Sequence, residues 1–137
     1  MELAREEDIA MHWLGWVVFV LALLEGGWLA FDGGRALVVG DYVTPRSGQY
    51  AGQLGPWTKA VAALGIDPRS TLMKSIHLAL GLAWIVVAIC FALQLPWAWT
   101  AMLVCAVLSL WYLPFGTILS VIQIAILLLP AVRSPGG

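Results

Sequence analysis

The chain has 137 residues and a formal net charge of −1, and 61% of it is hydrophobic while only 11% is charged. This composition excludes a strongly basic surface for nucleic acid, so we expect no nucleic-acid partner. From Ser75 to Val132 the chain runs 58 residues without Asp, Glu, Lys or Arg, which the surface of a soluble domain could not tolerate. We therefore expect an all-α integral membrane protein that forms one membrane domain over residues 1–137, with the lipid bilayer around it.

The first apolar stretch, residues 11–31, is expected to be the first transmembrane helix. The preceding segment, residues 1–8 (MELAREED), is acidic, whereas a secretory signal needs a basic start, so this helix should remain as an anchor. The paired glycines Gly26 and Gly27 are expected to loosen the end of the helix. Asp32 then marks its exit into water.

Residues 32–67 form the only substantial polar part of the chain and contain seven glycines, so we expect one long loop there. Residues 36–43 are β-prone but too short to assign. Within the loop, residues 56–64 (PWTKAVAAL) predict a short helix.

The apolar side chains of this short helix recur at i, i+4 and i+7, as Trp57, Val61 and Leu64. That spacing places them on one face of the helix. We expect the helix to lie in the membrane interface, with Lys59 turned to headgroups or water.

The long uncharged run must cross a bilayer more than once, since one helix of that length would reach ~87 Å against a hydrocarbon core of ~30 Å. Pro96 and Pro114 divide the run, because proline ends or kinks a helix. With the first helix, this predicts four transmembrane helices and one long loop between helices 1 and 2. The three later spans are expected at residues 68–95, 97–113 and 115–129.

Aromatic residues fall near the predicted ends of these spans, as aromatic belts at the two interfaces require. One interface would receive Trp13, Trp16, Trp97 and Trp99, and the other Trp28, Trp57, Trp111 and Tyr112, leaving Trp84 at mid-depth.

Basic residues gather on the loop side, so the positive-inside rule places the loop in the cytoplasm. The general character is that of small four-helix proteins of the bacterial inner (cytoplasmic) membrane, and we expect that location. The basic residues are Arg35, Arg46, Lys59, Arg69 and Lys74.

Polar side chains inside the spans are functional candidates, because ionisable groups in hydrocarbon are costly. Glu25 and His77 lie at matched depth on the first two spans, so we expect Glu25 to approach His77 or Lys74. The other members of this candidate cluster are Ser109, Ser120 and Gln123. Two interpretations remain open: hydrogen bonds that join helices, at ~0.6–2 kcal/mol each, or a proton or ligand site centred on Glu25.

Residue patterns for cofactor, metal or catalytic sites are lacking in the sequence. His12 and His77 are expected near opposite membrane faces, so they cannot ligate one haem. Cys90 and Cys105 lack CxxC spacing, and a GxSxG signature is absent. We expect no cofactor, no metal and no enzymatic activity, with both cysteines as buried free thiols.

These observations favour a non-catalytic small membrane protein, an accessory or scaffolding subunit of a larger membrane complex. Its partners would be other membrane-protein subunits or further copies of itself, and the bulky apolar fourth span suits lipid or such a partner. Small residues on spans two and three predict that these two pack together. The alternative is a small transporter or a proton- or ion-conducting oligomer that uses an intramembrane site at Glu25 and His77.

Overall fold

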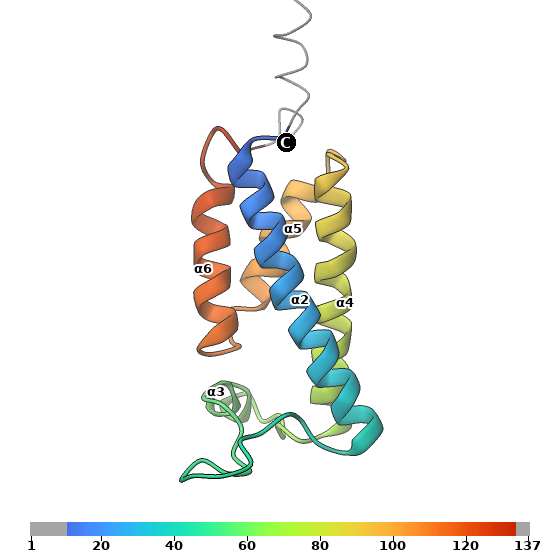
Figure 1. Ribbon diagram of the computed structural model, residues 1–137, viewed down its shortest axis with the longest axis vertical. Coiled ribbons are helices and arrows are strands. Elements are labelled where there is room, and N and C mark those ends of the chain that lie inside the picture. Colours follow the sequence, from blue (N-terminus) through green and yellow to red (C-terminus); the bar gives the residue numbers. More distant parts are fainter. Residues whose placement is uncertain (1–10, 134–137) are drawn as a thin grey trace, which may run out of the picture.

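The computed structural model describes residues 11–133, and within this range the chain forms five helices and no strand (Figure 1). The predicted all-α class is confirmed for this part of the chain. The acidic segment at residues 1–8, on which the expectation of a retained anchor rests, lies outside the described range. The helices are α2 (Trp13–Val39), α3 (Trp57–Ala63), α4 (Thr71–Ala92), α5 (Ala98–Leu108) and α6 (Phe115–Leu127).

Four of these helices form a bundle in which each contacts two neighbours (Figure 1). Helix α2 packs on α4 and α6, and α5 packs on the same two helices from the other side. The expected contact between α4 and α5 is present, but the most extensive contact joins α2 and α4. Helices α2 and α5 therefore lie opposite each other, and each contacts both α4 and α6.

Two helices, α2 with 27 residues and α4 with 22, are long and apolar enough to cross a membrane. At 1.5 Å per residue they reach ~40 and ~33 Å, against a hydrocarbon core of ~30 Å. Helices α5 and α6 are apolar too but have 11 and 13 residues, which gives only ~16 and ~20 Å. By length and composition the structure therefore supports two spans, while the expected third and fourth spans are shorter helices.

Helix α2 continues eight residues past the predicted end of the first span, as far as Val39. It begins where His12 Nδ1 accepts a hydrogen bond from the Leu14 amide (3.2 Å). It ends at Gly40, whose φ of +100° favours glycine and whose amide donates to the Ala36 carbonyl. The first part of the expected loop, including half of the unassigned β-prone segment, is therefore helical.

Glycines on α2 and α4 let these two helices approach closely instead of loosening them. A Cβ atom added at Gly81 would lie 2.6 Å from the Gly26 carbonyl oxygen, and one added at Gly33 would lie 2.6 Å from a backbone nitrogen of α4. Their neighbours are different: Gly27 faces open space, and Gly34 would meet only a side-chain methyl at 3.8 Å. One member of each glycine pair thus forms the α2–α4 contact, and the expectation of a loosened helix was wrong.

The short helix expected over residues 56–64 is α3, which lies below α6 in Figure 1, and its Trp57 ring contacts His77 of α4. Trp57 and Val61 are 5% and 3% exposed, whereas Leu64 is 77% exposed. Most of the apolar stripe is thus covered by the protein itself rather than turned to an interface. An interfacial position for α3 stays a prediction.

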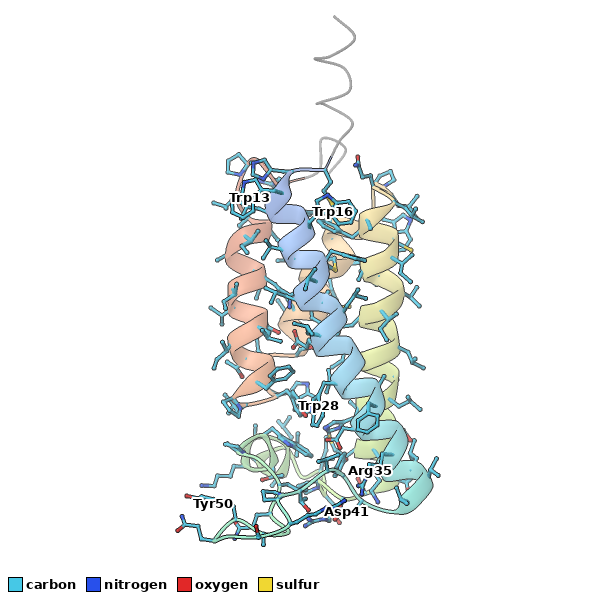
Figure 2. The ribbon with its side chains drawn as sticks, viewed as in Figure 1. Trp13, Trp16, Trp28, Arg35, Asp41 and Tyr50 are labelled. Carbon is cyan, nitrogen blue, oxygen red and sulfur yellow. The ribbon has the colours of Figure 1, made fainter. Side chains whose placement is uncertain are left out.

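Tryptophans lie toward both ends of the bundle. Figure 2 shows Trp13 and Trp16 at the end of α2 that is far from Tyr50 and Asp41, and Trp28 closer to the loop. At the far end, Trp99 Nε1 donates to the Leu127 carbonyl (2.8 Å), which ties the start of α5 to the end of α6.

Candidate functional site

Glu25 lies at the centre of the bundle, on the face of α2 that meets α6, and its side chain is fully buried. Its Oε1 atom accepts a hydrogen bond from Ser120 Oγ at 3.1 Å, and its Oε2 atom accepts one from Gln123 Nε2 at 2.9 Å. Ser120 and Gln123 are three residues apart, so they lie on one face of α6, and both are fully buried. The structure thus brings together three of the six candidate residues.

Lys74 and His77 have other hydrogen-bond partners than Glu25. Lys74 Nζ donates to the Gly40 carbonyl at 2.7 Å, where the unsatisfied carbonyls at the end of α2 attract a cation. His77 Nδ1 lies 2.9 Å from the Met73 carbonyl on its own helix. The partners of Glu25 therefore come from α6, where the sequence predicted α4.

Glu25 forms no ion pair with any described residue. Between residues 11 and 133 the structure contains one ion pair, Arg69 to Asp41 at 3.0 Å, and it lies outside the bundle. A buried carboxyl group with hydrogen-bond donors but no cation is unusual, because a desolvated charge needs compensation.

His77 is buried in a cluster of aromatic rings at the loop end of the bundle. Since the Met73 carbonyl can only accept, Nδ1 carries the hydrogen, and Nε2 is buried without a hydrogen-bond partner among the described residues. The rings come from the loop, α3 and the turn between α5 and α6, with centroids 4.7–5.4 Å from the imidazole. This aromatic cluster consists of Tyr42, Trp57, Trp111 and Tyr112.

Two tryptophan N–H groups, one on a fully buried ring and one on a partly exposed ring, donate to hydroxyl groups of other segments. Trp84, fully buried on α4, donates to Ser109 Oγ at 2.8 Å and joins α4 to the end of α5. Trp28 donates to the Tyr112 hydroxyl at 2.8 Å and joins α2 to the α5–α6 turn. Ser109, the sixth candidate residue, thus bonds to an indole rather than to Glu25.

Asp32 is a buried polar residue that the sequence analysis missed, because it was expected to mark the exit of the first span into water. It is 4% exposed, and its Oδ1 atom accepts a hydrogen bond from the Val43 amide at 2.7 Å. Asp32 follows Glu25 by seven residues, which places both on nearly the same face of a helix. That spacing was the signal that could have identified it.

Charged groups outside the bundle hold the loop in place. Arg69 donates to Asp41 Oδ1 (3.0 Å) and to the Gly52 carbonyl (2.9 Å), and the Tyr42 hydroxyl donates to the Pro68 carbonyl (2.8 Å). Partial burial by itself raises the pKa of Asp41, but hydrogen bonds from Arg69 and the Tyr42 amide lower it, and the resulting pKa lies below the ordinary value. Burial raises the pKa of Tyr42, which stays neutral.

Metal and haem sites were not expected, and residues 11–133 contain no group of three or more His, Cys, Asp or Glu side chains placed to hold a metal ion. His12 caps the first turn of α2, while His77 packs against Gly33. These two points on α2 are ~31 Å apart at 1.5 Å per residue, so the histidines cannot share one haem.

The arrangement can do two things chemically. The Glu25 carboxyl group can hold or release a proton in a water-excluded setting, and the aromatic cluster can fix the loop against the bundle. No protein-family model, curated protein or solved structure significantly matches the chain.

Proposed function

We propose that this chain is an integral protein of the bacterial inner membrane that serves as a non-catalytic accessory or scaffolding subunit of a larger membrane complex. One observation carries the membrane assignment: large apolar side chains are exposed on all four bundle helices, while Glu25, His77, Ser120 and Gln123 on these helices are fully buried. The exposed set includes Val20, Leu24 and Phe31 of α2, Leu82, Val86 and Ile89 of α4, Val104 and Val107 of α5, and Ile118, Val121 and Ile122 of α6.

An apolar surface of this extent is unfavourable in water, because soluble monomers rarely expose contiguous apolar patches beyond a few hundred Å². In hydrocarbon the same surface costs nothing, whereas Glu25 and Gln123 must be shielded. We place α5 and α6 in the bilayer beside α2 and α4, so that the bundle presents four helices to lipid. The positive-inside rule then favours a cytoplasmic position for the loop between α2 and α4.

Accessibility of introduced cysteines tests this topology. Ser47 lies in the loop, and Gln94 follows the opposite end of α4; both are exposed. In a chain in which Cys90 and Cys105 are replaced, Ser47→Cys and Gln94→Cys should react with a membrane-impermeant maleimide from opposite sides of the membrane. Labelling of both positions from one side would contradict a membrane-spanning α4.

The accessory role is supported by α6, whose outward side chains are bulky and offer a surface for lipid or for a partner helix. Ile118 and Val121 are both more than half exposed on this helix. We expect a stoichiometric membrane partner, or a second copy of the chain, to copurify in mild detergent and to be identified by mass spectrometry. Val121→Trp should weaken that association, whereas Val86→Trp on the lipid side of α4 should not. Recovery of the chain alone, as a monomer, from native membranes would contradict this role.

A second function, transport or conduction of protons or ions, is favoured by the full burial of Glu25 without a cation partner among residues 11–133. In proteoliposomes, Glu25→Gln would then abolish a flux that the wild-type protein shows while the protein stays folded. Asp67→Asn is the matched control, because it removes the same charge from an exposed position in the loop. Equal fluxes in wild type and Glu25→Gln would exclude this role for Glu25.

A further inference from the structure

The hydrogen bonding around Glu25 is incomplete in a way that points to a ligand. Both carboxyl oxygens accept a hydrogen bond, yet no cationic side chain between residues 11 and 133 balances the charge that an ionised group would carry. On the same amide that donates to Glu25, the Oε1 atom of Gln123 is buried and has no donor in the described part of the chain. The site thus combines a charge without compensation and an acceptor without a hydrogen.

A proton is the ligand that these atoms fit. A neutral carboxyl group carries one O–H donor and needs one acceptor. Ser120 Oγ can serve, since a serine hydroxyl in a helix can turn its own hydrogen to the carbonyl four residues earlier. A half-turn of the Gln123 amide offers its oxygen as a second acceptor, because the two ends of an amide have nearly the same shape. Both partners of Glu25 can therefore serve its protonated form.

A metal cation fits these atoms less well. A Ca²⁺ ion, for example, takes about six to eight oxygen ligands, whereas only two side chains of the described residues, Ser120 and Gln123, hydrogen-bond to the Glu25 carboxyl group. The other titratable side chains of the interior do not supply a permanent positive charge either. Among residues 11–133 they are Asp32 on α2, Tyr42 in the loop, His77 on α4, Cys105 on α5 and Tyr112 in the α5–α6 turn.

We propose that Glu25, Ser120 and Gln123 form a buried proton-binding site in which Glu25 carries a proton at neutral pH. The inference rests on the second function proposed above and names its ligand as a proton. Binding of a proton does not require that the proton be transported, so the two proposals can fail separately.

Carbon-13 NMR of the full chain in lipid nanodiscs tests the site. With ¹³C-labelled glutamate, the Glu25 side-chain carboxyl signal is identified by its loss in Glu25→Gln. A second chain, in which Glu2, Glu6 and Glu7 are replaced by Gln, leaves Glu25 as the only glutamate and does not depend on the folding of Glu25→Gln. We expect Glu25 to keep the shift of a protonated carboxyl group at about pH 7, where an ordinary glutamate with a pKa of about 4.3 is ionised.

A carboxylate shift for Glu25 at neutral pH would overturn the proposal. A change of the signal when choline is replaced by Na⁺ would also overturn it and would indicate a metal-cation site.

Gln123→Met supplies an independent measurement, since a neutral Glu25 keeps Ser120 as its partner and the protein should stay folded with Glu25 protonated. Loss of folding in this variant, with the exposed Gln94→Met as the matched control, would indicate an ionised Glu25 that depends on its amide donor. If the proteoliposomes showed a flux but Glu25 were ionised, only the proton-binding proposal would be wrong. If Glu25 were protonated but no flux were seen, only the transport function would be wrong.

Discussion

Gly26→Ala and Gly27→Ala should have opposite effects on stability, although the two residues are adjacent on the same helix. A Cβ atom at Gly26 would lie 2.5 Å from Trp84 Cβ and 2.9 Å from the Gly81 carbonyl oxygen. Neither atom can move aside by a side-chain rotation, so α2 and α4 must separate. A Cβ atom at Gly27 meets nothing within 4 Å.

The expected magnitudes follow from two effects. Overpacking in a close-packed contact costs about 1–3 kcal/mol, and alanine in place of glycine in a helix stabilises by up to about 1 kcal/mol. Gly26→Ala should therefore lower the free energy of unfolding by up to about 2 kcal/mol, and Gly27→Ala should raise it by up to about 1 kcal/mol. Because the helix-propensity gain is common to both, the difference between the variants isolates the packing effect.

Unfolding followed by circular dichroism in a mild detergent measures both free energies. The adjacent pair Gly33 and Gly34 repeats the experiment one contact further along α2, since only a Cβ atom at Gly33 would strike the backbone of α4. If the two members of either pair shifted stability equally and in the same direction, the described contact between α2 and α4 would be refuted.

Three further changes test other contacts. Trp84→Phe leaves the Ser109 hydroxyl without its indole donor, so the free energy of unfolding should fall by about 1 kcal/mol in the same assay. Trp57→Ala removes the ring that joins α3 to the aromatic cluster, so limited proteolysis should cut the loop faster while the helical signal stays. Asp41→Asn keeps an acceptor oxygen but removes the negative charge that pairs with Arg69; because the folded pKa of Asp41 is lowered, the contribution of this charge is present at neutral pH and is lost as the pH falls through that pKa. The Asp41 and Arg69 side chains are 45% and 46% exposed, so this contribution should stay below about 1 kcal/mol, and a larger effect would contradict the described pair.

The helical class and the position of α3 followed from the sequence because they depend on local signals. Apolar runs, prolines and the spacing of Trp57 and Val61 act within a few residues of one another. The end of α2 was predicted too early because local signals were misleading there. Glycines normally favour the end of a helix, and an aspartate such as Asp32 normally lies in water. Here Gly26 and Gly33 are in close contact with α4. Asp32 is buried, and its Oδ1 atom accepts a hydrogen bond from the Val43 amide of the loop.

The partner of Glu25 could not be predicted because depth in a bundle does not determine direction around a helix axis. Helical rise gave Glu25 and His77 similar depths. It could not show that Glu25 faces α6, or that His77 lies among aromatic rings contributed by three separate segments. Such contacts depend on tertiary packing. In a single sequence the residues that form them are scattered polar and aromatic positions with no recognisable spacing.

Helix α2 therefore has two faces whose roles can be separated by mutation. Gly26 and Gly33 hold α4 by backbone contact, whereas Glu25 holds α6 by hydrogen bonds to its side chains. A change at Gly26 should separate α2 from α4 and leave the environment of Glu25 on α6 in place. A change at Gln123 should alter that environment without moving α4. The glycine contact joins α2 to α4, whereas the proposed proton-binding site joins α2 to α6. A variant that weakens the bundle at Gly26 but keeps Glu25 protonated would therefore show that proton binding depends on the α2–α6 contact and not on α4.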